Sequence, residues 1–333
     1  MTAIIKAENL TKTYGGPDDG TLAVDSINFE VDQGEIFGFL GPNGAGKTTT
    51  QRMLNTLLEP TAGEIWIDGR NLQKDSYPIK RIMGSVPEMS NVYPELSGWD
   101  NLMFTAKIYL VPKKEREARA YELLEMFDLW DKRDILAENY SKGMQRRLSI
   151  AMGIIHNPTL LFLDEATTGL DAKSARDIQD LIRQMNEDGT TIFMTTHLIE
   201  EANQLCDRVA IINHGKIATI DSPENLKKTV EQVQSVIIAL EPAGGAHGNA
   251  LSEMPGVIDS VKMGDKWRLY TEDPSALLPK LMAYAESKNL QIVSLNTLAP
   301  SLEDVYLQIT GGKLGSEQEK PDKKQTQMKK GRR

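Results

Sequence analysis

The sequence predicts an α/β fold, with a large domain around a parallel-stranded sheet followed by a small α+β domain. A glycine-rich loop, Gly41–Thr48, lies between a short apolar run and a segment of helical spacing. A second apolar run ends in two adjacent carboxylates, Asp164 and Glu165. Beyond them, one helical segment alternates with two strand segments, as in a parallel sheet layered by helices: Ala172–Glu187, Thr190–Thr195 and Arg208–Asn213.

The first part of the chain predicts an antiparallel sheet. Three of its segments alternate between apolar and polar residues: Ala3–Leu10, Leu22–Glu30 and Gly63–Asp68. A polar loop, Tyr14–Gly20, separates the first two segments. We therefore expect a strand pair before the glycine-rich loop and a third strand after it.

The glycine-rich loop fits the pattern G-x-x-x-x-G-K-[ST] at every fixed position. The loop and the residue after it comprise Gly41, Pro42, Asn43, Gly44, Ala45, Gly46, Lys47, Thr48 and Thr49. Glu35–Leu40 predicts a buried strand before it and Thr48–Leu58 a helix after it, so inward-pointing N–H groups would hold an anion at the positive end of that helix. In such a loop Lys47 reaches the β- and γ-phosphates and the Thr48 hydroxyl binds Mg²⁺. The alternative is a glycine-rich turn that matches by accident.

A charged helical region follows. Ser97–Asp100 has the S-x-x-[DE] form that begins helices. From Met103 to Leu136 the pattern is helical, with an apolar stripe of Leu123, Leu124, Met126 and Phe127. We expect a helical subdomain over about 88–150, within a first domain that spans residues 1–230.

The acidic pair ends a predicted strand, Thr159–Leu163. Strand ends in open α/β sheets face the ligand crevice. Asp164 can therefore hold Mg²⁺ through water, and Glu165 can polarise the water that attacks a γ-phosphate. Two solvated acids opening a loop are the alternative, which the phosphate loop in the same chain makes less attractive.

A domain boundary is predicted near Val230, followed by a small α+β domain over residues 231–310. Its expected strands and helices are Val233–Leu240, a hairpin of Val257–Val261 and Trp267–Thr271, Pro274–Ser287, Gln291–Asn296 and Ser301–Ile309. Residues 311–333 are rich in Lys and poor in apolar residues, which predicts a disordered tail.

The composition excludes several classes of protein. A net charge of -9 argues against a nucleic-acid binder, which needs a basic face. The single cysteine, Cys206, permits no intrachain disulfide and fits a reducing compartment. No signal peptide is recognised in Met1–Leu10, and no apolar run approaches the length that crosses a bilayer. If the protein serves transport, we expect another chain to supply the pore.

Over roughly Ala3–Lys228, the motifs resemble those of the nucleotide-binding subunits of ABC transporters. The phosphate loop and acidic pair resemble the Walker A and Walker B elements, and Tyr140–Arg147 resembles the family signature in its Tyr-Ser-Lys-Gly-Met-Gln form. Gly169-Leu170-Asp171 resembles the D-loop, Thr195-Thr196-His197 the switch histidine, and Tyr14 an aromatic that stacks on adenine. The resemblance implies a P-loop NTPase fold of the ABC cassette type, with a mixed sheet core, an antiparallel β subdomain and a helical subdomain.

The resemblance also implies roles for these residues. Ser141 would cap a helix while N–H groups of Lys142 and Gly143 face the γ-phosphate of an ATP held by a partner subunit. The signature residues assigned to nucleotide binding are Ser141, Lys142, Gly143, Met144 and Gln145, and the D-loop adds Asp171. His197 would donate a hydrogen bond to the γ-phosphate. The alternatives are a plain helix start, a structural histidine and a tyrosine packed on the sheet.

One position departs from the family pattern. Where these subunits most often carry a glutamine that touches Mg²⁺, this chain has Glu88, in Ser85-Val86-Pro87-Glu88. Similar glutamates occur among export-type members. A carboxylate there would favour Mg²⁺ and disfavour a γ-phosphate before the metal arrives. The predicted metal ligands are therefore Thr48, Glu88 and Asp164.

The sequence thus predicts an ATPase with ATP and Mg²⁺ as ligands and Lys47, Glu165 and His197 as catalytic residues. The segment Ser301–Tyr306 is similar to the C-terminal extension of ABC-2-type exporter subunits of the drug-resistance or sodium-export kind. We expect a homodimer or heterodimer of ATPase subunits on an ABC-2-type membrane permease, at the cytoplasmic face of the membrane, with no nucleic-acid partner. The alternative is a soluble family member that acts on ribosomes or in DNA repair.

Overall fold

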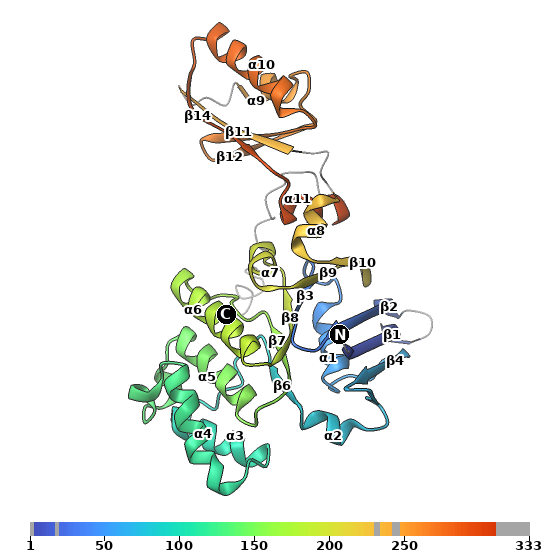
Figure 1. The fold of residues 1–333 in the computed structure, drawn as a ribbon, viewed down its shortest axis with the longest axis vertical. Helices are drawn as coiled ribbons and strands as arrows, with labels where there is room; N and C mark the ends of the chain where they lie inside the picture. Colours follow the sequence, from blue (N-terminus) through green and yellow to red (C-terminus); the bar gives the residue numbers. More distant parts are fainter. Residues whose placement is uncertain (1–2, 17–19, 230–233, 242–246, 311–333) are drawn as a thin grey trace, which may run out of the picture. The chain divides into compact units, whose positions relative to one another are not determined.

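The computed structural model describes residues 3–16, 20–229, 234–241 and 247–310. The chain divides into two compact units, Met1–Asn225 and Leu226–Arg333, whose elements are labelled in Figure 1. The boundary predicted near Val230 and the predicted tail, residues 311–333, lie outside the described residues.

A six-stranded sheet forms the centre of the first unit. Its strands, in spatial order, are β10 (Lys216–Asp221), β9 (Arg208–Asn213), β3 (Ile36–Leu40), β8 (Thr191–Thr196), β7 (Leu160–Asp164) and β6 (Met83–Val86). All neighbours are parallel except β10, which pairs with β9 in the antiparallel sense. The parallel register pairs Asp164 with Thr195 and Leu40 with Thr196, so β3, β7 and β8 end at one edge. The predicted α/β class is confirmed.

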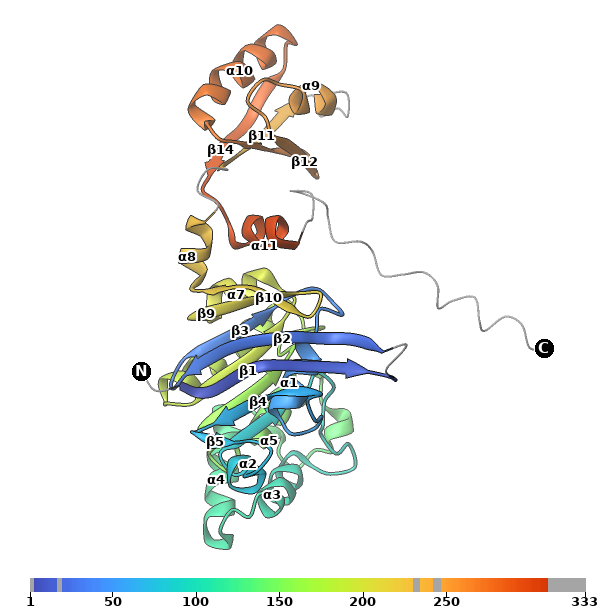
Figure 2. The same ribbon diagram turned by 90° about the vertical axis from the view of Figure 1, so that its right-hand side faces the viewer.

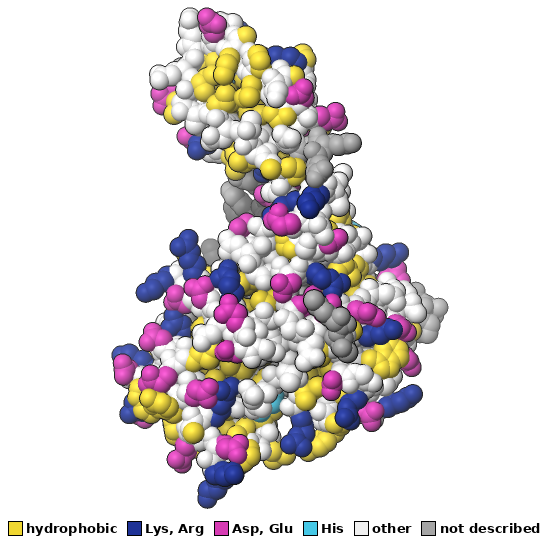
Figure 3. Space-filling model, in the orientation of Figure 1, with side chains coloured by type: hydrophobic (Ala, Val, Ile, Leu, Met, Phe, Trp, Pro, Cys, Tyr) yellow, Lys and Arg dark blue, Asp and Glu magenta, His cyan; other side chains and the backbone are white. Residues whose placement is uncertain are grey.

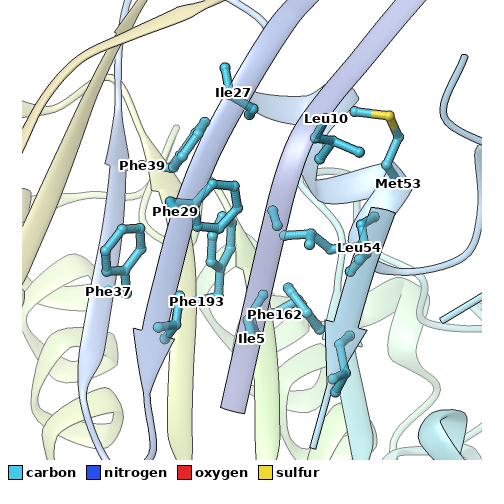
Figure 4. Packing of buried hydrophobic residues seen from close by; sticks show 14 of the residues in the cluster. Ile5, Leu10, Ile27, Phe29, Phe37, Phe39, Met53, Leu54, Phe162 and Phe193 are labelled. Carbon is cyan, nitrogen blue, oxygen red and sulfur yellow. The ribbon is translucent and has the colours of Figure 1, made fainter. Parts of the chain in front are cut away.

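An antiparallel sheet packs against the central one (Figure 2). Its order is β2 (Thr21–Asp32), β1 (Ala3–Tyr14), β4 (Ala62–Ile67) and β5 (Arg70–Asn71). The core between the sheets is aromatic: rings of Phe29, Phe39 and Phe193 lie with centroids 5.5–6.1 Å apart, as Figure 4 shows. Burying such rings is a large part of what holds the two sheets together.

The helix after the phosphate loop, α1 (Lys47–Leu54), ends earlier than predicted. Thr56 takes a left-handed φ of 58°, which stops the helix, and the N–H groups of Leu57 and Leu58 turn back to the Arg52 carbonyl. Leu57, within the predicted helix, is 73% exposed. The predicted extension to Leu58 is therefore wrong.

Helix α2 (Ser76–Lys80) precedes β6, and the predicted helical region contains α3 (Gly98–Ile108), α4 (Lys113–Met126), two 3-10 turns, η1 (Trp130–Lys132) and η2 (Ala137–Asn139), and α5 (Lys142–Ile154). The predicted start of α3 is confirmed, because the Ser97 hydroxyl oxygen accepts the Asp100 N–H at 3.0 Å. Of the predicted apolar stripe, Leu123, Leu124 and Phe127 are fully buried. Three further helices follow: α6 (Ala172–Glu187), α7 (Ile199–Leu205) and α8 (Pro223–Lys228).

The second unit is α+β. Its sheet has the order β12 (Asp259–Met263), β13 (Lys266–Thr271), β11 (Gln234–Glu241) and β14 (Gln291–Leu298), and its helices are α9 (Gly248–Ser252), α10 (Pro274–Ser287) and α11 (Leu302–Thr310). The predicted hairpin is confirmed as β12–β13, which turns at Gly264 with φ 63°. Within this unit, buried Arg268 of β13 forms an ion pair with buried Asp304 of α11 at 2.9 Å.

Within the described residues, no helix is both long enough and apolar enough to cross a bilayer. Acidic and basic side chains are interspersed over the visible face of the first unit (Figure 3).

Candidate active site

A cavity of about 280 Å³ opens at the edge of the sheet where β3, β7 and β8 end. The lining brings together residues from the phosphate loop, the acidic strand end and the switch segment: Ala23, Asn43, Gly44, Gly46, Lys47, Thr48, Thr49, Glu88, Glu165, Thr168 and His197. Nine of these eleven were predicted from the sequence, although they come from four separate segments. The parallel topology is what collects them, since successive strands end at the same edge.

The phosphate loop depends on its glycines. Gly44 and Gly46 have φ values of 82° and 108°, which side chains other than glycine rarely adopt. At Gly41 a Cβ would lie 2.4 Å from the Ile212 carbonyl oxygen. Within this loop the Lys47 ammonium donates to the carbonyls of Gly41 and Pro42 at 2.7 and 3.2 Å. Burial lowers the pKa of Lys47, while the carboxylates of Glu165 and Asp164 oppose that change.

Glu165 lies opposite this loop. Its backbone is left-handed, with φ 49°, and its side chain is only 7% exposed. One carboxylate oxygen accepts the Thr168 hydroxyl at 2.8 Å and lies 2.7 Å from His197 Nδ1, while the other lies 3.7 Å from Lys47 Nζ. The three residues predicted to be catalytic are thus neighbours around one carboxylate. This is the geometry that a positioned base requires.

The donors for Mg²⁺ are compatible with that ion. The described residues contain no cluster of three or more His, Cys, Asp or Glu that could hold a metal by itself. Thr48 and Glu88 line the cavity, and Asp164, beside it, accepts a hydrogen bond from the Thr195 hydroxyl. Mg²⁺ usually takes only one or two carboxylates and completes its shell with water and substrate phosphate oxygens. One hydroxyl and two carboxylates beside a phosphate loop therefore fit it. Burial raises the pKa of Asp164.

Tyr14 flanks the cavity rather than lining it. It ends β1, is 41% exposed, and its hydroxyl lies 3.4 Å from Thr49 Oγ1. An exposed ring beside the phosphate loop is free to stack on a planar group. The predicted alternative, a tyrosine packed into the sheet, does not fit this exposure.

The signature residues Ser141–Gln145 do not line the cavity of their own chain. The Ser141 hydroxyl oxygen caps α5 by accepting the Met144 N–H at 3.2 Å, and Ser141 and Lys142 are exposed. Gln145 donates to the Ala137 carbonyl at 3.1 Å, inside the chain. Asp171, assigned to the nucleotide from the sequence, caps α6 by accepting the N–H groups of Lys173 and Ser174.

Comparison with known proteins decides the family. A family model described as ABC transporter matches residues 24–168. Linearmycin resistance ATP-binding protein LnrL of Bacillus subtilis (strain 168) is 33% identical over 310 residues, which cover 92% of this chain and 98% of LnrL. Daunorubicin/doxorubicin resistance ATP-binding protein DrrA of Streptomyces peucetius is 34% identical over 319 residues, or 93% of each chain. The chain belongs to the ABC transporter ATP-binding proteins.

A solved ABC structure is similar as well. It is a dimeric ATP-binding cassette in a post-hydrolysis state bound to ADP and Pi, with a TM-score of 0.60 and 29% identity over 66% of this chain and 98% of that one. The predicted cassette fold is therefore confirmed. The match covers nearly all of the solved cassette but only part of this ABC ATP-binding protein. This agrees with the presence of a second unit, Leu226–Arg333, in the chain.

Four residues of the ABC site were missed from the sequence. Ala23 and Thr168 line the cavity. Arg146 and Glu201 are buried beside it, 6% and 3% exposed. Thr168 could have been found, because it follows Glu165 by three residues at the start of a loop. Nothing local marks Arg146 or Glu201 as buried, since each stands in a helix next to a similar charged residue, Arg147 or Glu200.

Proposed function

We propose that the chain binds and hydrolyses ATP between two ATPase subunits and so drives export through a separate ABC-2-type permease at the cytoplasmic face of the membrane. The observation that carries this proposal is the Glu165 carboxylate, 2.7 Å from His197 Nδ1 and 3.7 Å from Lys47 Nζ, facing a phosphate loop. Relatives named for drug resistance, bacitracin transport and Nod factor export support export over the ribosome or DNA-repair alternative.

The site residues divide the work of hydrolysis among themselves. Glu165 accepts the proton of the attacking water. His197 Nδ1–H donates to that carboxylate and orients it, and in the protonated ring Nε2–H donates toward the γ-phosphate. Lys47 exchanges its two loop carbonyls for phosphate oxygens, a charge-assisted contact. Thr48, Asp164 and Glu88 are the residues that would hold Mg²⁺, which supplies charge neutralisation at the phosphates.

The decisive test is Glu165→Gln. We expect this variant to bind ATP with parental affinity but to hydrolyse it about 10²–10⁴-fold more slowly, because only the base is lost. Lys47→Ala should instead weaken ATP binding itself. Glu187→Gln, at an exposed position on α6, is the matched control and should turn over at the parental rate.

Turnover by Glu165→Gln at the parental rate would contradict the assignment of the base. Export is tested in cells in which the parent protein confers resistance to a compound from a panel of antibiotics. The Glu165→Gln protein should remove that resistance, and resistance that persists would count against ATP-driven export.

A further inference from the structure

Arg146 is a buried cation whose three hydrogen bonds all go to backbone carbonyls. It lies on α5, and its side chain is 6% exposed. Nε donates to the Ala166 carbonyl and Nη2 to the Asp164 carbonyl, both at 2.8 Å, while Nη1 donates to the Pro87 carbonyl. One guanidinium group therefore joins helix α5 to two separate loops.

Both loops carry functional side chains. The carbonyls of Asp164 and Ala166 belong to the residues on either side of Glu165, and Pro87 directly precedes Glu88. At Glu165 the backbone is left-handed, and its N–H donates to the Thr195 carbonyl at 3.1 Å. A residue other than glycine keeps that conformation only where its surroundings fix it. Arg146 bonds the carbonyls on either side of Glu165, and Thr195 bonds its N–H, so both contribute to fixing it.

The chemistry of the site calls for arginine. A planar guanidinium with five donors can bond three carbonyls in one plane, whereas a lysine ammonium is a single point. Burial lowers the pKa of Arg146 to about 10, with nearby Asp164, Glu201, Glu88 and Glu165 opposing that fall. The side chain therefore stays charged at neutral pH, and its hydrogen bonds are of the stronger, charge-assisted kind.

We propose that Arg146 is a positioning residue for hydrolysis, holding the Glu165 carboxylate toward the phosphate loop and coupling it to the loop of Glu88. The inference rests on the proposed ATP hydrolysis and adds a residue that acts through the backbone on either side of Glu165. Because Ser141 caps α5, this role also makes the signature helix a direct support of the base in its own chain.

The test is Arg146→Lys in the full-length protein. This variant keeps the charge but cannot reach all three carbonyls, so we expect kcat for ATP hydrolysis to fall about 10- to 100-fold, the cost of misplacing a catalytic group by about 1 Å. The KM for ATP and the measured ATP affinity should stay within about threefold of the parent, because the phosphate loop is untouched. Arg146→Met, which removes all three hydrogen bonds, should be slower still or fail to fold.

Two comparisons separate positioning from lost stability. Arg268→Lys makes the same change at an arginine of similar burial, 7% exposed, whose partners include Ser235 and Asp304 of the second unit. It should lower thermal stability and leave kcat parental. In single-turnover assays, the double variant Arg146→Lys/Glu165→Gln should hydrolyse ATP no more slowly than Glu165→Gln alone. A residue that acts through the Glu165 carboxylate has no effect once that carboxylate is gone.

The outcomes divide clearly. If the parent hydrolyses ATP and Glu165→Gln does not, but Arg146→Lys equals the parent, this inference fails and the proposed function stands. A loss in Arg146→Lys that Arg268→Lys matches, or that adds fully to Glu165→Gln, also overturns it. If the parent itself does not hydrolyse ATP, it is the proposed function that fails.

Discussion

Glu201 is an acid that the fold keeps away from water. It lies on α7, 3% exposed, and one carboxylate oxygen accepts the Thr167 hydroxyl at 2.7 Å. Its other oxygen has no hydrogen-bond partner among the described residues. Burial raises the pKa of Glu201, although hydrogen bonds from the Thr196 and Thr167 hydroxyls oppose part of that rise. The ionised form is therefore destabilising, which is a typical cost of placing polar residues around an active site.

This cost gives a pH-dependent prediction for the nucleotide-free protein. A carboxyl group whose pKa is higher in the folded than in the unfolded state destabilises the fold most strongly above its folded-state pKa. The destabilisation disappears as the pH falls to 4.5, the ordinary pKa of a glutamate. Glu201→Gln removes the charge and keeps an acceptor for Thr167. At pH 8 we expect its Tm to exceed the parent's by about 2 °C or more, and the gap to close near pH 4.5.

Glu200→Gln, one residue earlier and exposed, is the matched control and should leave Tm unchanged at both pH values. A lower Tm for Glu201→Gln at pH 8 would show that the ionised form is held favourably, with Arg146 as the nearby cation.

At the scale of elements, α5 and α6 meet at Gly143. The sequence assigned this glycine to the nucleotide of a partner subunit. In the structure it is buried, and a Cβ there would lie 2.7 Å from Ser174 Oγ and 3.2 Å from Ser174 Cβ, within the same chain. The Ser174 hydroxyl in turn donates to the Asp171 carboxylate at 2.7 Å. A side chain at position 143 would have to displace Ser174, so the packing of these two helices favours glycine apart from any role at an interface.

Gly143→Ala tests this packing. We expect it to cost about 1–3 kcal/mol of stability, the usual penalty for overpacking. Ser174→Ala should relieve the shorter of the two contacts, so the double variant should recover part of the loss in thermal unfolding. If the double variant is destabilised by the sum of the two single changes, α6 is not what excludes a side chain at position 143.

The same elements show what the sequence could predict. The bounds of α6 and α10 match the predicted Ala172–Glu187 and Pro274–Ser287, because Asp171 and Asp273 cap them and such caps are visible in the sequence. The end of α1 was missed, since nothing in the local pattern indicates the left-handed turn at Thr56. Arg146 was missed for a different reason. Its role depends on carbonyls 18, 20 and 59 residues away, which only the tertiary fold brings together.

At the scale of the molecule, one chain holds an incomplete set of the predicted nucleotide contacts. The cavity contains the phosphate loop, Glu165 and His197, but not Ser141–Gln145. Ser141 and Lys142 are exposed at the start of α5, where N–H groups and the helix dipole favour an anion. The solved relative described above is a dimer. Together these observations favour a site completed by a second subunit, whose signature covers the nucleotide.

Ser141 allows a dimerisation test that leaves the fold alone. Asp and Asn cap helices about as well as Ser, so Ser141→Asp and Ser141→Asn should both preserve α5. In a Glu165→Gln background with ATP and Mg²⁺, we expect the parent and Ser141→Asn to sediment as dimers, and all proteins to be mostly monomeric without nucleotide. Ser141→Asp should stay monomeric, because a second negative charge about 4 Å from a γ-phosphate costs about 1–4 kcal/mol at the dielectric constants of a protein surface.

Running the same series on residues 1–225 separates ATP-dependent pairing of the first unit from any association through the second. Equal dimerisation of the Ser141→Asp and Ser141→Asn proteins would show that the signature does not face the nucleotide of a partner.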